Sequence, residues 1–249
     1  MWDWTAFFHY LHSKYLFVGA GITLGLSLAA LAIGLCCGII AALMRMSPHP
    51  LINKPASFYV WLMRGTPVLV QLIIIYTGLP QLGLRLNVLE SALLGLGLNE
   101  GAYLAEIIRA GILSVPRGQF EAARAVGMSY PMTMRFIVLP QALRIIIPPL
   151  GNTFNALLKT SSLASVISME ELLRRTEELV QVQFKVLEIF IVAALYYLVM
   201  TTVWGLIQER LEAHYARSLV PYGGRRDGEA RAARLKRKMD AEILSHDAQ

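Results

Sequence analysis

Residues 15–44 read YLFVGAGITLGLSLAALAIGLCCGIIAALM and contain no formally charged side chain. A helix rises about 1.5 Å per residue and a bilayer core is about 30 Å thick, so this stretch can cross a membrane with some tilt. It is too long for the apolar core of a signal peptide, and no small-residue cleavage site precedes a polar start. We therefore expect a membrane-spanning helix that stays in the mature protein.

The rest of the chain shares this apolar character. Of its 249 residues, 55% are hydrophobic and 16% are charged, and the mean hydropathy is +0.51. An ordinary soluble domain has about 25% charged residues. A net charge of +6 in so apolar a chain is typical of cytoplasmic membrane flanks rather than of nucleic-acid contacts. The composition therefore predicts a membrane protein that contacts lipid and does not bind nucleic acid.

Four further segments are candidates to cross the membrane. They are residues 58–79, 88–113, 134–158 and 189–208. An ionised side chain at the centre of a membrane helix costs about 2.5 to 3.5 kcal/mol, so Glu100, Glu106 and Arg144 should face protein or a wet cavity. We expect an all-α membrane protein with about five transmembrane helices.

The lysines and arginines predict the orientation and the division of the chain. With the N-terminus outside, the inner segments carry sixteen of these residues and the outer segments six, which favours an external N-terminus and a cytoplasmic C-terminus. The expected parts are an external segment 1–14, a transmembrane domain 15–214 and a basic cytoplasmic tail 215–249. The tail fits a solvated segment or a helix on the anionic inner leaflet.

An inner connection, residues 114–135, predicts two short helices joined by a tight turn. Residues that start or end helices punctuate it: Pro116, Gly118, Gly127, Ser129 and Pro131. The stretch QFEAARAV at 119–126 forms the first helix, and Ser129 can cap a second helix that re-enters the membrane. On the outer side, residues 168–185 predict a surface helix. Its buried face is Leu172, Leu173, Leu179 and Val180.

Enzyme chemistry has little support in the sequence. The chain has neither a G-x-x-x-x-G-K-[ST] phosphate loop nor an H-E-x-x-H pair, and its five histidines lie outside the predicted spans, so no serine there has a base. The two cysteines, Cys36 and Cys37, are adjacent and form neither a disulfide framework nor a metal site. We expect no catalytic residue and no metal.

Polar residues instead recur along one face of each of two predicted membrane helices. They are Asn99, Tyr103 and Glu106 on one helix, and Asn152, Asn155 and Lys159 on the other. One interpretation is interhelical hydrogen bonding with a snorkelling lysine. The other is a polar path whose carboxylate, amides and ammonium could hold a zwitterion. Pro140, Pro148 and Pro149 tend to kink the second helix, and kinks favour a cavity.

The inner connection also carries a motif. Glu121-Ala122-Ala123, Gly127 and the residues IVLP at 137–140 match the pattern E-A-A-x3-G-x9-I-x-L-P without a gap. This resembles the permease signature of bacterial ATP-binding-cassette importers. The resemblance implies a type I importer permease fold, in which this loop is a coupling helix that docks in a groove of a separate ATPase. The coupling residues it implies are Glu121, Ala122, Ala123, Gly127, Leu139 and Pro140.

The resemblance extends over about residues 18–214. The matching stretches are 64–67, 71, 76–80, 102–106, 109–110, 118–119, 139–144, 148–149 and 163–164. They look like the polar-amino-acid branch, in particular its cystine-type permeases. One departure is Thr160, where many relatives carry an acidic or amide residue after the lysine.

The resemblance implies a multi-pass protein of the inner membrane and its partners. A second permease copy or a related permease, two ATPase subunits and an external solute-binding protein would complete the importer. ATP and magnesium would be bound by the ATPase, and this chain would need no cofactor of its own.

The resemblance also implies residue roles. Glu121 would favour the dipole of the coupling helix, Ala122 and Ala123 would allow close approach to the ATPase, and Gly127 would permit a turn that side chains obstruct. The implied substrate path is Tyr103, Glu106, Asn152, Asn155 and Lys159, with Glu106 alternatively paired to Arg109 or Arg144.

Two other classes of protein fit the sequence less well. A stand-alone channel or secondary carrier would use Glu106 and Arg144 directly, but it leaves the inner motif unexplained. A membrane enzyme is disfavoured because the nucleophile and base are missing. The sequence does not choose among cystine, glutamine and basic amino acids.

Overall fold

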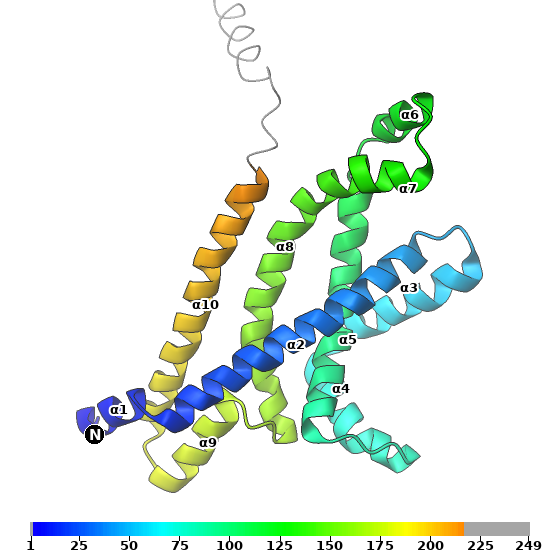
Figure 1. The fold of residues 1–249 in the computed structure, drawn as a ribbon. Coiled ribbons are helices and arrows are strands. Elements are labelled where there is room, and N and C mark those ends of the chain that lie inside the picture. Colours follow the sequence, from blue (N-terminus) through cyan, green and yellow to red (C-terminus); the bar gives the residue numbers. More distant parts are fainter. Residues whose placement is uncertain (1, 217–249) are drawn as a thin grey trace, which may run out of the picture. The chain divides into compact units, whose positions relative to one another are not determined.

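The computed structural model describes residues 2–216, where every regular element is a helix. The chain divides into two units, residues 1–209 and 210–249, and most of the predicted tail 215–249 lies outside the described residues. The helices, drawn in Figure 1, are α1 (Trp4–Leu11), α2 (Lys14–Arg45), α3 (Pro50–Gly65), α4 (Val68–Ile73), η1 (Ile74–Gly78), η2 (Leu79–Leu82), α5 (Val88–Leu113), α6 (Arg117–Ala125), α7 (Tyr130–Thr133), η3 (Met134–Val138), α8 (Leu139–Thr160), η4 (Ser161–Ile167), α9 (Leu172–Gln183) and α10 (Val186–Ala216). The predicted all-α class is confirmed.

Three of these helical stretches are long and apolar enough to cross a membrane. They are Lys14–Arg45, Tyr130–Ile167 and Val186–Tyr215. The bent pair Pro50–Gly65 and Val68–Leu82 makes a fourth if it counts as one span. Helix α5 coincides with the predicted segment 88–113 and is long enough, but it is less apolar. It packs along α2 and also against α3 and α8, so protein covers most of the polar residues that lower its hydropathy.

Glycines of α2 allow α2 and α5 to pack this closely. A methyl group on Gly38 would lie 2.8 Å from Cβ of Leu104, and one on Gly34 would lie 2.9 Å from Cβ of Glu100. Both distances are shorter than atoms tolerate, so only glycine fits unless the backbones move apart. The contact at Gly34 fixes the position of the Glu100 stem against α2.

The second predicted membrane segment, 58–79, falls within the bent pair and is not one continuous helix. Helix α3 and the stretch Val68–Leu82 are bent by 107° at a break formed by Thr66 and Pro67. A proline disfavours helical geometry at the residue before it, and Thr66 is extended, with φ −122° and ψ 146°. The apolar residues on both sides of the break hid it in the sequence.

Two buried amide side chains replace the backbone hydrogen bonds lost at this break. Nε2 of Gln71 donates to the carbonyl oxygen of Met63 (2.9 Å) and to Oγ1 of Thr66 (2.8 Å). Nδ2 of Asn99, on α5, donates to the same Met63 carbonyl (3.0 Å) and to Oε1 of Gln71 (3.1 Å). An unpaired carbonyl at membrane depth is costly, so these amide hydrogen bonds stabilise the non-helical backbone at the break.

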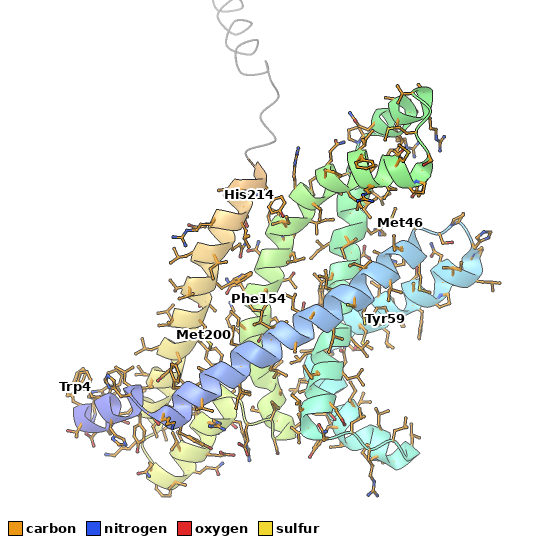
Figure 2. The ribbon with its side chains drawn as sticks, viewed as in Figure 1. Trp4, Met46, Tyr59, Phe154, Met200 and His214 are labelled. Atoms are coloured by element: carbon orange, nitrogen blue, oxygen red, sulfur yellow. The ribbon has the colours of Figure 1, made fainter. Side chains whose placement is uncertain are left out.

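Helix α8 passes through Pro148 and Pro149 without interruption. The irregular stretch lies earlier, at the π-helix η3 just before Pro140. Helix α10 packs beside α8 through Trp204, whose ring centroid lies 4.4 Å from that of Phe154 and whose Nε1 donates to the carbonyl oxygen of Gly151 at 2.8 Å. Phe154 is labelled in Figure 2.

The predicted outer surface helix is α9, in which Leu172 and Thr176 are fully buried. Its N-cap, Glu171, is also fully buried and joins three helices. Its carboxylate accepts hydrogen bonds from the backbone N–H of Arg174 (2.8 Å), from Oγ1 of Thr23 on α2 (3.2 Å) and from the hydroxyl of Tyr197 on α10 (2.9 Å). This one carboxylate therefore ties α9 to α2 and α10.

Candidate functional site

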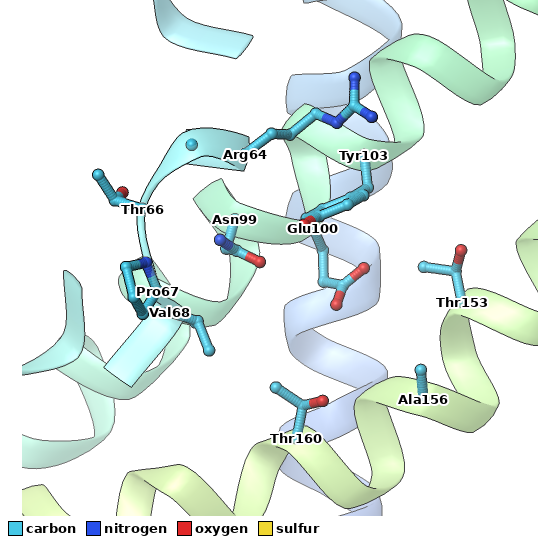
Figure 3. A pocket seen from close by; sticks show the side chains of 11 residues that line it. Arg64, Thr66, Pro67, Val68, Asn99, Glu100, Tyr103, Thr153, Ala156 and Thr160 are labelled. Atoms are coloured by element: carbon cyan, nitrogen blue, oxygen red, sulfur yellow. The ribbon is translucent and has the colours of Figure 1, made fainter. Parts of the chain in front are cut away.

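A cavity of about 500 Å³ lies where the α3–α4 break, α5 and α8 face one another. The break contributes residues 64–68, α5 contributes Asn99, Glu100 and Tyr103, and α8 contributes Thr153, Ala156 and Thr160. Figure 3 shows these side chains around the open space. Carboxylate, amide, hydroxyl and guanidinium groups thus surround one cavity among predominantly apolar helices, which suits a small polar solute.

Glu100 supplies the carboxylate of this cavity. Its side chain extends into the space between α5 and α8 (Figure 3), and the residue is 8% exposed. Within residues 2–216 no hydrogen bond or ion pair reaches it, although its neighbour Asn99 makes two hydrogen bonds. The prediction that Glu100 faces protein or a cavity is confirmed, and its place in the cavity was not predicted.

Tyr103 also lines the cavity, as the predicted substrate path requires. The guanidinium carbon of Arg64 lies 5.3 Å from the centre of its ring, a distance at which a cation is attracted to an aromatic face. Arg64 comes from the end of α3, so this contact joins the α3–α4 break to α5. A cationic and an aromatic group therefore border the cavity together.

Glu106 lies outside the larger cavity, among arginines of three helices. It pairs with Arg45 of α2, with Arg64 of α3 at 3.3 Å and with Arg109 of α5 at 3.0 Å. A smaller cavity of about 370 Å³ is lined by Arg45, Arg64 and Glu106. Of the partners considered for Glu106, Arg109 is found here, while Arg45 and Arg64 were not foreseen. The geometry gives Glu106 a role in joining helices.

The predicted face of α8 does not line the larger cavity. Asn152 accepts a hydrogen bond from Nε2 of Gln208 on α10 at 3.0 Å, and Lys159 is exposed. The Oδ1 atom of Asn155 is buried and has no hydrogen-bond partner in the described part of the chain. The cavity instead meets the residues one position further on, Thr153, Ala156 and Thr160. Consecutive residues of a helix point about 100° apart, so the strongly polar residues and the residues that line the cavity lie on different faces of α8.

The second candidate region is the inner connection, and it forms the predicted pair of short helices. Helix α6 ends with two hydrogen bonds, from the backbone N–H of Gly127 to the carbonyl of Arg124 (2.9 Å) and from that of Met128 to Ala123 (3.0 Å). This is a Schellman ending, which requires a left-handed residue, and Gly127 has φ +77°. Ser129 takes the N-cap position of α7, but its side chain makes no capping hydrogen bond.

The predicted coupling residues differ in their access to a partner. Glu121, Ala122, Leu139 and Pro140 are exposed, whereas Ala123 is 1% exposed and packs within the chain itself. A methyl group on Gly127 would meet nothing within 4 Å. The need for glycine there comes from backbone geometry, and the expected obstruction by a side chain is absent. Helices α6 and α7 lie at the opposite end of the molecule's first unit from α9 (Figure 1).

Membrane helices around a polar cavity, with paired short helices at one end, form the architecture of a solute permease. Residues 34–217 match the family described as binding-protein-dependent transport system inner membrane component. The match covers well over half of the chain, and the chain belongs to this family.

Named relatives agree with this assignment. The chain is 41% identical over 202 residues to a probable amino-acid ABC transporter permease protein, YckA, of Bacillus subtilis, covering 81% of this chain and 89% of the relative. It is 42% identical to the L-cystine transport system permease protein TcyB of the same organism, covering 78% and 83%. A crystal structure of an amino acid ABC transporter with histidines has 39% sequence identity and a TM-score of 0.81, covering 86% of this chain and 99% of that one. The chain is thus a membrane-spanning permease subunit of an ATP-driven importer, a multi-pass inner-membrane protein and not an enzyme.

Proposed function

We propose that this permease carries polar amino acids and that they pass through the cavity between the α3–α4 break, α5 and α8. The observation that carries the proposal is the grouping of Glu100, Arg64 and hydroxyl groups in one cavity among apolar helices. An amino acid is a small zwitterion and needs groups of both charges. Relatives named for amino acid, L-cystine, glutamine and arginine transport support this substrate class.

The α6–α7 region is proposed as the docking element for an ATPase subunit. Its exposed side chains include charged Glu121 and apolar Val126 and Tyr130. A rigid helix pair fixed by the Schellman turn at Gly127 could transmit a rotation of the partner to α8, which follows it through η3. ATP and magnesium would bind the partner, with no cofactor in this chain.

The remaining parts of the importer follow from the same proposal. An external solute-binding protein would deliver the amino acid, and a second permease copy or a related permease would complete the path. The N-terminus would lie outside and the C-terminus in the cytoplasm, as the distribution of lysine and arginine favours. Of the predicted path residues, Tyr103 keeps that role. Glu106 and Asn152 are better explained by their contacts to neighbouring helices.

Reconstitution in proteoliposomes tests the proposal. The chain is inserted with its ATPase and binding protein, and uptake of labelled arginine, cystine and glutamine is measured with ATP, without ATP, and with an ATPase variant that binds but does not hydrolyse ATP. We expect uptake of at least one of these amino acids with ATP and active ATPase only. Uptake that proceeds equally without nucleotide would instead establish a stand-alone carrier or channel.

A further inference from the structure

We propose that Glu100 binds a cationic nitrogen of the transported solute, an ammonium or guanidinium group, while the solute occupies the cavity. This inference rests on the proposed function, since it names the group of the substrate that the cavity recognises. It assigns the charge recognition to Glu100, which is not among the residues of the substrate path implied by the family resemblance.

The first argument is the contrast between Glu100 and two other carboxylates that lie between helices, the half-buried Glu106 and the fully buried Glu171. Glu106 has three arginine partners, and Glu171 accepts hydrogen bonds from Thr23, Tyr197 and a backbone N–H. Glu100 is only 8% exposed, yet no cation or hydrogen-bond donor of residues 2–216 pairs with it. A buried carboxylate without a partner is costly. A cation that enters with the solute would supply the missing partner.

The second argument is that Asn99, Thr153 and Thr160, which line the cavity together with Glu100, offer acceptors or hydroxyl groups. Both N–H groups of the Asn99 amide are already used, by the carbonyl of Met63 and by Oε1 of Gln71, which leaves the Asn99 oxygen as an acceptor. Thr153 and Thr160 face Glu100 from α8 and can accept as well as donate. A wall of this kind matches a ligand with several N–H donors.

The third argument is that Arg64 does not neutralise Glu100. Its guanidinium pairs with Glu106 and lies over the ring of Tyr103, and no ion pair joins it to Glu100. In Figure 3 the Arg64 guanidinium and the Glu100 carboxylate extend in different directions from the Tyr103 ring. The cavity therefore presents separate positive and negative ends, and the negative end is open to a ligand.

Glu100→Gln tests this assignment because it keeps the shape of the side chain and removes the charge. Uptake of labelled arginine, citrulline and glutamine is measured in the complete proteoliposome system, with Glu209→Gln as the control for an exposed carboxylate elsewhere in the chain. Citrulline resembles arginine but has a neutral side chain. We expect Glu100→Gln to raise the KM for at least one substrate by about tenfold or more, and Glu209→Gln to leave it unchanged.

The pattern among substrates identifies the nitrogen. A loss for arginine alone assigns Glu100 to a cationic side chain, and an equal loss for all three assigns it to the α-ammonium group. An unchanged KM for every substrate that the wild type carries overturns the inference while leaving the proposed function intact. If the wild type shows no ATP-dependent uptake of any amino acid, the proposed function itself fails.

A stability measurement separates binding from a structural role. If Glu100 serves the solute, Glu100→Gln removes an unpaired buried charge, so the midpoint of thermal unfolding should stay the same or rise. Recovery of the ATPase with the variant should also be unchanged. A lower midpoint together with equal losses of uptake for all substrates and of ATPase recovery would show that Glu100 supports the fold, and the inference would be wrong.

Discussion

At the scale of single residues, the carboxylates that lie between helices divide into those whose partners the protein supplies and those whose partners it does not. Glu106 brings α2, α3 and α5 together through its arginines, and Glu171 fastens α9 to its neighbours. Such residues hold the scaffold in one arrangement. Glu100 has no such partner in the described chain, and this difference is what separates a structural carboxylate from a binding one.

Removing the charge of Glu106 should destabilise the protein. Glu106→Gln leaves three guanidinium groups close together without a counter-charge, and we expect a loss of about 2 kcal/mol in the free energy of unfolding. Denaturation in detergent measures this loss. The control is Glu170→Gln, which breaks a more exposed pair with Arg175 at 3.4 Å and should cost less than about 0.5 kcal/mol. Equal effects of the two substitutions would contradict the role given to Glu106.

Glu171 predicts a pH dependence of stability. Burial raises the pKa of its carboxyl above the ordinary value of 4.5, against the hydrogen bonds that lower it. Since the folded protein holds this proton more tightly than the unfolded chain, the contribution of Glu171 to stability is greatest below pH 4.5 and falls as the pH rises through the raised pKa. Between pH 4 and 7 the unfolding midpoint of the wild type should fall relative to that of Glu171→Gln. Parallel curves would contradict this prediction.

The sequence predicted protein surroundings for Glu100 and Glu106 and offered Arg109 as a partner of Glu106, but it indicated neither Arg45 nor Arg64. Arg45 and Glu106 are 61 residues apart, and nothing local in the sequence indicates that α2 brings them together. On α8 the sequence pattern drew on Asn152, Asn155 and Lys159 because they are strongly polar, whereas the residues that line the cavity are Thr153, Ala156 and Thr160. Packing of α8 against α10 decides which face is open, and that packing is not local.

At the scale of elements, the α3–α4 break shapes the cavity, and buried amides maintain it. Gln71→Leu should leave the Met63 and Thr66 acceptors with fewer donors and lower the free energy of unfolding by about 1–3 kcal/mol. Gln81→Leu, which removes the same group from an exposed position in η2, is the matched control. If both variants unfold like the wild type in detergent, the amides do not stabilise the break.

The turn at Gly127 offers a second test at this scale. Gly127→Ala forces a left-handed conformation on a residue with a side chain, which costs about 1–2 kcal/mol, although a methyl group there has room. We expect weaker recovery of the ATPase with normal membrane insertion. Gly118 lies in α6, the helix before this turn, and a methyl group there has equal room. Gly118→Ala should therefore bind the ATPase like the wild type. Equal recovery by the two variants would show that the turn geometry is dispensable.

Local punctuation explains which elements the sequence could predict. Gly127 and the prolines around it predicted the α6–α7 pair. The capping box of Asn87 and Glu90 begins α5 at Val88, where the predicted segment 88–113 starts. Pro67 is the same kind of signal, but segment 58–79 was located from its apolar residues alone, and no break was predicted within it. The hydrophobicity of a segment predicts well whether the segment lies in the membrane, but it does not show whether the helix is continuous there.

At the scale of the whole molecule, the proposed function puts the cavity among the membrane helices and the α6–α7 region on the cytoplasmic side. A separate ATPase would then drive transport by binding this region. Val126, between α6 and α7, is 76% exposed, and Leu82 of η2 is 78% exposed in a segment expected on the outer side. Single cysteines at these two positions can therefore report the two faces of the membrane.

The most direct measurement labels these cysteines in a variant without Cys36 and Cys37, using a maleimide that does not cross membranes. We expect Val126→Cys to react only from the cytoplasmic side and to be protected when the ATPase binds, and Leu82→Cys to react only from outside, whether or not the ATPase is bound. Labelling of Val126→Cys from outside, or labelling that the bound ATPase does not change, would contradict the claim.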